Sequence, residues 1–128
     1  FIQAPRLLDR DLRLRGVDAS VYVAGQLSGT EGYCEAIASG LMCALFVYAQ
    51  LKGMQAPLLP VETAFGALLD YATDPATQDY QPMHVNFGIL KPLDQHIRNK
   101  GMRYAAYAER GSRAMEGYVA DIRAKGLL

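Results

Sequence analysis

The sequence predicts a mainly α-helical fold with one or two short strands. Two long stretches, 33–51 and 102–125, repeat apolar residues at the helical period, whereas only 21–24 has the composition of a strand. The chain has 128 residues, of which 51% are hydrophobic, and this is enough for the core of one small domain. Two separately folded domains are therefore not expected.

The first 24 residues precede the glycine-rich turn and the helical region. Residues 1–15 mix leucines with charges in no clear period and are predicted to be extended, with turns. Val21–Ala24 is a β-branched and aromatic run that is typical of a buried, parallel-type strand. Because no second strand is predicted to pair with it, we expect the chain either to self-associate through this edge or to repack.

A glycine-rich turn, 25–33, connects this strand to the first long helix. Ser28 and Glu31 have the spacing of a capping box, with Thr30 as a competing cap. The helix extends to about Leu51 and has no charged residue between Glu35 and Lys52. Such a helix is expected to be covered on most sides.

Three further helices are predicted. Glu62–Tyr71 forms the next one, closed by Asp74 and Pro75, and an ordered loop follows over 78–90. Pro92 is expected to open a third helix with a stabilising pair, Asp94 and Arg98. The last helix spans Met102–Lys125, with an inward face made of Ala105, Ala108, Met115, Tyr118, Val119 and Ile122.

Composition limits the setting in which the chain works. The longest apolar stretch, 37–51, is shorter than a membrane span of about 20 residues, so no membrane association is expected. Two cysteines that cannot pair along one helix fit a reducing, cytoplasmic location.

The charge of the chain is unevenly distributed. The net charge is zero, but 91–128 holds 8 basic and 4 acidic residues. This end of the chain is either a phosphate-facing surface or an ordinary solvated helix.

The glycine turn is the main candidate site. Free backbone N–H groups at a helix N-terminus favour anionic or electron-rich ligand groups, and glycines let a ligand approach the backbone closely. The same pattern also serves as a tight strand-to-helix connection.

A family resemblance makes this reading more specific. Residues 23–33, continued by Glu35-Ala36 and Ala38-Ser39-Gly40, are similar to a flavin-contacting motif shared by two families of tRNA-modifying flavoproteins. Three further blocks, 1–8, 63–69 and 81–88, resemble only the folate-dependent tRNA uracil-5-methyltransferase family, TrmFO or Gid. The other family modifies the wobble uridine by carboxymethylaminomethylation, and block 81–88 argues against it.

The resemblance implies a fold and a chemistry. Residues 1–53 would be the C-terminal strand-turn-helix piece of a Rossmann-like FAD-binding fold, and 54–128 a helical C-terminal region. The family methylates the T-loop uridine of tRNA with FAD, methylenetetrahydrofolate and NAD(P)H. Its dinucleotide fingerprint and reactive cysteines lie upstream of the matched region, so this chain alone is expected to be inactive and to hold no catalytic residue.

The resemblance also implies which residues form the site. Gly25 and Gln26 would lie beside the ribityl and pyrophosphate groups, Gly29–Gly32 would face the isoalloxazine edge, and Tyr33 would stack near the pterin. The predicted cofactor-binding set is Gly25, Gln26, Gly29, Thr30, Glu31, Gly32 and Tyr33.

Other polar residues receive weaker roles. A candidate RNA-binding set, aided by Tyr104 and Tyr107, lies in the basic tail: Arg98, Lys100, Arg103, Arg110 and Arg113. Cys34 and Cys43 are expected to be buried helix thiols, Glu35 to face solvent, and His84 to have a surface or capping role. His96 lacks the spacing of a metal ligand, and no metal site is predicted.

An alternative from another class remains open. The chain would then be a noncatalytic helical module that keeps this region as a binding or assembly surface. A compact, well-behaved monomer or dimer would distinguish such a module from a piece of an enzyme.

Overall fold

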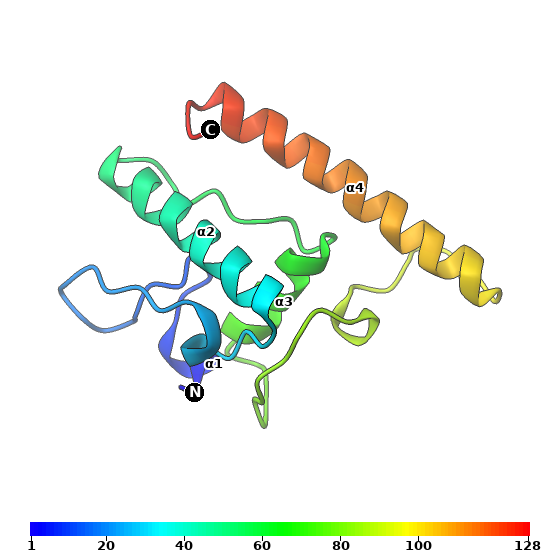
Figure 1. Cartoon of the computed structure of the whole chain (residues 1–128), viewed down its shortest axis with the longest axis horizontal. Coiled ribbons are helices and arrows are strands. Elements are labelled where there is room, and N and C mark those ends of the chain that lie inside the picture. Colours follow the sequence, from blue (N-terminus) through cyan, green and yellow to red (C-terminus); the bar gives the residue numbers. More distant parts are fainter.

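A computed structural model describes all residues, Phe1–Leu128, and shows a mainly helical chain. The helices are α1 (Ala4–Leu7), α2 (Tyr33–Leu51), α3 (Ala64–Thr73) and α4 (Lys100–Ala124), with two 3-10 turns, η1 (Gly25–Ser28) and η2 (Phe87–Ile89). Figure 1 shows α4 as a long, separate rod whose C-terminal end returns toward the end of α2. The predicted dominance of helix is confirmed, but a Rossmann-like sheet is not present in this chain.

The main core lies between the N-terminal segment, α2 and α3. Its nine buried residues come from all three parts, from the linker before α3 and from the loop after it: Ala4, Leu8, Leu12, Met42, Phe46, Leu59, Leu69, Ala72 and Tyr80. A smaller cluster of Ala49, Ile122 and Leu127 attaches the end of α4 to the end of α2. Much of α4 therefore stands outside the main core.

The N-terminal segment differs from its prediction. Residues 4–7 form a short helix, begun by Pro5 in its first turn, where a proline costs no hydrogen bond. The predicted strand Val21–Ala24 is wrong, because only isolated antiparallel bridges form here, Leu8 with Leu14 and Arg13 with Tyr22. A strand needs a continuous partner, and the backbone beside this run, residues 12–14, makes only two hydrogen bonds with it, from the Leu14 N–H to the Val21 carbonyl and from the Val23 N–H to the Leu12 carbonyl. The free strand edge through which we expected self-association is therefore missing.

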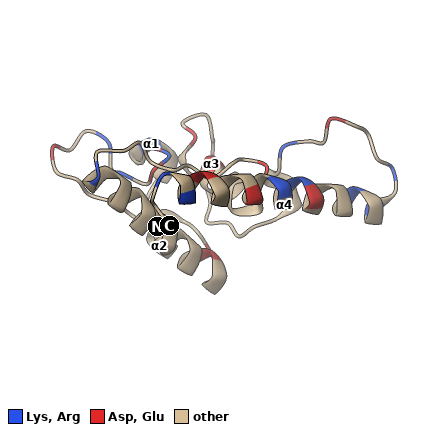
Figure 2. Cartoon of the chain, turned by 90° about the horizontal axis from the view of Figure 1, so that it is seen from above, with Lys and Arg blue, Asp and Glu red and all other residues tan.

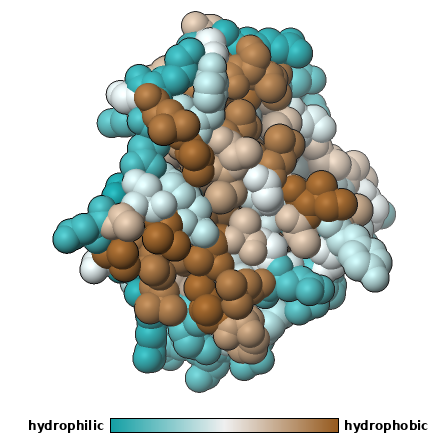
Figure 3. All heavy atoms as spheres, turned by 60° about the vertical axis from the view of Figure 1, so that its left-hand side comes forward, coloured by the Kyte–Doolittle hydropathy of each residue, from teal (hydrophilic) through white to brown (hydrophobic).

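Helix α2 has the predicted bounds but less cover than expected. It starts after Gly32 and ends at Leu51, and Gly53, two residues later, reverses the chain with a φ of +71°. One face is buried through Ser39, Met42, Phe46 and Ala49. The opposite face is open, so the prediction of cover on most sides is wrong, and hydrophobic side chains reach the surface in patches (Figure 3).

Helix α2 also bears on the question of membranes. It is the one helix in the structure with the length and apolar composition to cross a bilayer, although the sequence was expected to contain no such segment. A core helix of a soluble protein has the same composition. Since one face of α2 is packed against the protein core, its composition alone does not indicate a span.

Helix α3 begins two residues after its predicted start and closes at Asp74, as predicted. The Thr63 hydroxyl caps it by accepting a hydrogen bond of 3.0 Å from the Gly66 N–H. Leu68 and Leu69 are buried as predicted, whereas Ala64 is exposed.

The region before α4 holds the clearest error. No helix opens at Pro92, and Asp94 and Arg98 form no ion pair. Two carbonyls of this segment accept hydrogen bonds from the Arg110 guanidinium, at 2.8 Å from Lys91 and 3.1 Å from Pro92, and these contacts hold it in an irregular course. Helix α4 starts only where the Asn99 side chain caps the chain.

Helix α4 covers the predicted final helix, but its inward face is smaller. Ile122 is buried, Met115, Tyr118 and Val119 are half-buried, and Ala105 and Ala108 are exposed. The Tyr118 hydroxyl donates a 2.6 Å hydrogen bond to the Pro57 carbonyl and so ties α4 to the linker before α3.

Candidate functional site

The glycine turn is a compact loop that leads into α2. Turn η1 ends at Gly29 in the left-handed region with φ +89°, and Gly32 has φ +88° directly before the helix. An L-residue rarely adopts these angles, so glycine at these two positions lets the chain reverse and enter α2. Here the backbone itself requires the glycines.

Polar side chains of the turn hold the turn together. The Gly25 N–H donates to the Ser39 hydroxyl at 2.7 Å, and the Gly25 carbonyl accepts from the hydroxyls of Ser28 at 2.7 Å and Thr30 at 2.8 Å. The predicted capping role of Ser28, Glu31 or Thr30 is therefore wrong, because Gly32 is the N-cap and has no side chain to cap α2. The hydroxyls of Ser28 and Thr30, which were predicted to cap α2, instead bind the Gly25 carbonyl and stabilise the turn.

A second segment, 80–83, lies against the turn. The buried Tyr80 hydroxyl donates to the Ser28 carbonyl at 2.7 Å, and Thr30 forms a parallel bridge with Met83. A Cβ on Gly29 would lie only 2.3 Å from the Tyr80 hydroxyl oxygen. Gly29 is thus needed for close packing inside the protein, where the sequence suggested an approach to a ligand.

These contacts divide the predicted cofactor-binding set. Gly29 and Thr30 are buried, Gly25 and Glu31 are half-buried, and the Glu31 N–H is occupied by the Met83 carbonyl at 2.9 Å. Gln26, Gly32 and Tyr33 are exposed. The structure therefore places three residues of the set at the surface and uses the others mainly to shape the turn.

The start of α2 has the free donors that the site needs. The N–H groups of Gly32 and Tyr33 have no acceptor within the protein. They lie at the positive end of a 19-residue helix, so they favour negative charge or a carbonyl oxygen. The Glu35 carboxylate lies beside Gly32 at this end of the helix, where one oxygen accepts a 3.1 Å hydrogen bond from the Val85 N–H, but it accepts no hydrogen bond from the N–H of Gly32 or Tyr33.

That contact of Glu35 corrects one expectation, and the two cysteines correct another. Glu35 is half-buried against the 81–88 segment, whereas we expected it to face solvent. Cys34 is exposed at the first turn of α2 and not buried as predicted, because it lies on the uncovered side. Cys43 is half-buried, and its burial raises the pKa of the thiol, which favours the less reactive protonated form.

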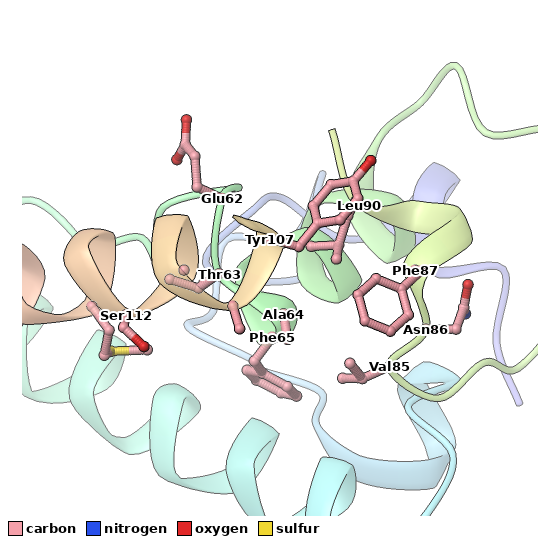
Figure 4. Close-up of a pocket in the computed structure, with 13 residues that line it drawn as sticks. Glu62, Thr63, Ala64, Phe65, Val85, Asn86, Phe87, Leu90, Tyr107 and Ser112 are labelled. Atoms are coloured by element: carbon pink, nitrogen blue, oxygen red, sulfur yellow. The ribbon is translucent and has the colours of Figure 1, made fainter. Parts of the chain in front are cut away.

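A second hollow, which the sequence did not reveal, lies between α3, η2 and α4. It has a volume of about 590 Å³, and Figure 4 shows Phe65, Val85 and Phe87 around it with Tyr107 on the α4 side. The rings of Phe87 and Tyr104 stack at 4.0 Å between centroids. Aromatic residues at 87, 104 and 107 were the available signal, but their proximity depends on an irregular loop that no periodicity predicts.

Basic residues of α4 are partly engaged by the protein. Arg110 binds the 91–92 carbonyls, Arg103 reaches the carbonyls of Ile97 and Arg98 at 3.3 and 3.4 Å, and Arg113 pairs with Glu109. Figure 2 shows basic and acidic residues interleaved along α4. Arg98 and Lys100 are exposed without an ion-pair partner.

His84 and His96 are both exposed, which fits the surface role expected for His84. No group of three or more metal-ligating side chains occurs in the structure.

The chain is thus a helical segment whose long helix α2 begins with a glycine-rich turn and free N–H groups. Elements of this kind bind anionic groups of nucleotide-type ligands. A family model described as "Glucose inhibited division protein A" matches residues 1–55, which include the turn and all of α2. Curated relatives extend the match along nearly the whole chain.

Several of these relatives are named methylenetetrahydrofolate–tRNA-(uracil-5-)-methyltransferase TrmFO. The protein of Syntrophotalea carbinolica is 43% identical over 91% of this chain, that of Thermotoga neapolitana 43% over 93%, and that of Sphingopyxis alaskensis 46% over 90%. The chain is therefore similar to TrmFO proteins along about nine tenths of its own length. It spans about a quarter of the length of these relatives, 25%, 27% and 25% respectively.

Proposed function

We propose that this chain is the flavin-facing part of a methylenetetrahydrofolate-dependent tRNA (uracil-5-)-methyltransferase. The identity to TrmFO across the glycine turn supports the family's chemistry, and the free N–H groups of Gly32 and Tyr33 are the structural observation that carries the assignment. The proposed setting is the cytoplasm, with tRNA as the substrate and NAD(P)H as the reductant.

The residues present fit a flavin. The isoalloxazine ring carries carbonyl oxygens and, when reduced, a negative charge, and free donors at a helix N-terminus suit both. When bound, FAD would supply the redox chemistry of methyl transfer from the folate. Gly32 and Tyr33 would hold its ring through backbone N–H groups, Gln26 would contact its polar chain, and Gly25, Gly29 and Thr30 would keep the turn in shape.

Tyr33 has a separate proposed role. Its side chain is 88% exposed at the start of α2, so its ring is free to stack on a planar group such as a pterin. For RNA phosphates, Arg98 and Lys100 are the better candidates of the predicted set, since Arg103, Arg110 and Arg113 are engaged within the chain.

The test places this chain in a full-length context. A chimera of Thermotoga neapolitana TrmFO that carries this chain in place of its matching segment is expected to be purified with FAD, visible by its absorbance. Tyr33→Ala and Tyr33→Pro both remove the ring, but only proline removes the N–H. Proline is suited to the first helical position, so the helix is expected to survive.

The proposal predicts that Tyr33→Pro binds FAD at least tenfold more weakly than Tyr33→Ala, the effect of about one hydrogen bond to a charged group, ~1.5 kcal/mol or more. Equal affinities in two folded variants would reject the assigned donor. A folded chimera that does not bind FAD would reject the flavin role altogether. The isolated chain is expected to bind no FAD at micromolar concentration, and tight binding by it would show that the site needs nothing else.

A further inference from the structure

The cavity between α3, η2 and α4 is a second candidate site, formed by other residues than the glycine turn. Its volume of about 590 Å³ lies within the range of pockets that bury a small ligand, ~300 to 1,000 Å³. We propose that this cavity binds one unpaired base of an RNA substrate, and that the cations near the start of α4 bind the adjoining phosphates. The inference rests on the proposed function for RNA as the substrate and is independent of the flavin.

Aromatic side chains from three elements form the walls of the cavity. Phe65 comes from α3, Phe87 from η2 and Tyr107 from α4, and Figure 4 shows the three rings around the hollow. The rings of Phe87 and Tyr107 lie 5.7 Å apart between centroids, at an interplanar angle of 59°. Aromatic rings are the usual stacking partners of unpaired RNA bases, so these walls suit a base.

Phe87 is held in place by its neighbours without any ligand. Its ring stacks on Tyr104 at 4.0 Å between centroids, yet the side chain is still 46% exposed and lines the cavity. The Asn86 side chain fixes the loop, because it accepts a 2.8 Å hydrogen bond from the Gly88 N–H and donates one of 3.0 Å to the His84 carbonyl. A wall that is ordered in advance lowers the entropic cost of binding.

Three cations flank these aromatic side chains. Lys100 and Arg103 lie over the Tyr104 ring, at 5.5 and 5.6 Å from its centroid. Arg110 lies over the Tyr107 ring at 5.2 Å. No ion pair of the chain includes any of the three cations, and the two arginines bind backbone carbonyls, which carry no net charge. Their positive charge therefore remains available to RNA phosphates beside the cavity.

The polar groups of the lining suit the edge of a base. Tyr107 and Ser112 bring hydroxyl groups to the cavity, and a hydroxyl can either donate or accept a hydrogen bond. Glu62 also lines the cavity, but its carboxylate points away from the aromatic walls (Figure 4). The cavity therefore combines stacking surfaces with adaptable hydrogen-bonding groups.

An RNA base explains this combination better than an apolar small molecule or a polypeptide does. An apolar molecule gains nothing from cations that lack a carboxylate partner. A polypeptide that buried these cations would have to neutralise them with acidic side chains of its own. RNA supplies both a planar ring for the walls and a negative phosphate for the cations, and residues 91–128, with 8 basic and 4 acidic side chains, attract a polyanion.

The experiment measures the affinity of the full chain for a fluorescein-labelled RNA hairpin and for an RNA duplex of equal length without a loop, by fluorescence anisotropy over a range of salt concentrations. Ala108→Trp fills the cavity from an exposed position of its lining. Ala120→Trp is the matched control, since Ala120 is also exposed on α4 but does not line the cavity. Phe87→Ala removes a wall, and Lys100→Gln removes a cation. Circular dichroism checks that α4 persists in each variant.

We expect the wild type and Ala120→Trp to bind the hairpin about tenfold or more tightly than the duplex, because only the loop offers unpaired bases. Ala108→Trp and Phe87→Ala should lose this preference and keep the salt dependence. Lys100→Gln should keep the preference, while the slope of log affinity against log salt concentration falls by about one. A merely structural defect would change the preference and the slope together.

Four outcomes would overturn the base site. These are no binding of the hairpin by the wild type, equal affinity for hairpin and duplex, the same preference in Ala108→Trp and Ala120→Trp, and a dimer of the chain that Ala108→Trp breaks. Equal affinity would leave only phosphate contacts, and the dimer would assign the cavity to a second copy. Hairpin preference in a chain whose chimera binds no FAD would reject the flavin role alone, whereas FAD binding without hairpin preference would reject the base site alone.

Discussion

Tyr80 is expected to be the side chain from outside the glycine turn that contributes most to its stability. Its ring is buried in the main core, and its hydroxyl donates a 2.7 Å hydrogen bond to the Ser28 carbonyl. Tyr80→Phe keeps the ring and leaves a buried carbonyl without this donor. The cost of such an unsatisfied group is about 1 to 3 kcal/mol of unfolding free energy. We therefore expect a loss in this range, with little change in native secondary structure.

The assay is urea denaturation at pH 7 followed by circular dichroism, with Tyr33→Phe as the matched control. The Tyr33 side chain is 88% exposed and has no hydrogen-bond partner in the protein, so its hydroxyl is expected to contribute less than about 0.5 kcal/mol. If Tyr80→Phe lost no more stability than Tyr33→Phe, the bond from Tyr80 would not hold the turn. The turn would then depend on its own hydroxyls alone.

Further predictions concern pH, backbone packing and capping. Burial raises the pKa of Tyr80 to about 12, with a smaller contribution from Tyr71, so the folded state keeps a proton that the unfolded state loses near pH 10. Stability should be intact below pH 10 and fall by about 2 to 3 kcal/mol toward pH 12, and Tyr80→Phe should remove this part of the fall in alkaline urea titrations. Gly66→Ala should unfold or severely destabilise the chain in thermal melts, because its Cβ would lie 1.9 Å from a backbone oxygen; Gly117→Ala, in open space on α4, should stabilise it by up to about 1 kcal/mol. Thr63→Ala should cost about 0.5 to 2 kcal/mol in urea unfolding through loss of the α3 cap, and an unchanged midpoint would contradict that role.

The long helices were predictable from sequence, and the irregular segments were not. Apolar spacing located α2 and α4, and Gly53 marked the end of α2 because a left-handed residue stops a helix. The course of 91–99 was missed because it is set by the Arg110 guanidinium, 18 and 19 residues away along the chain. Local propensity contains no information about such a contact, so Pro92 looked like a helix start.

The candidate site was likewise predictable from sequence only in part. Its position at a glycine turn before α2 follows from sequence, because positive φ angles restrict residues 29 and 32. Which members of the set face solvent does not follow, since this depends on Tyr80 and Met83 packing against the turn from some 50 residues away. Sequence spacing suggested that Ser28 and Thr30 were caps, whereas their hydroxyls both bind the Gly25 carbonyl. A motif therefore locates the loop, and long-range packing decides the role of each residue.

The uncovered side of α2 connects these observations to function. A helix with no charge from residue 36 to residue 51 is suited to contacts around most of its circumference, yet the chain packs only one face. Because exposing large apolar side chains to water is unfavourable, a sequence that keeps Ile37 and Leu41 outward encodes contacts that the chain itself does not satisfy. The free N–H groups at residues 32 and 33 likewise lack a partner within the chain. Both features lie in the N-terminal half of α2, so the exposed apolar side chains Ile37 and Leu41 follow directly after the candidate flavin site along the helix.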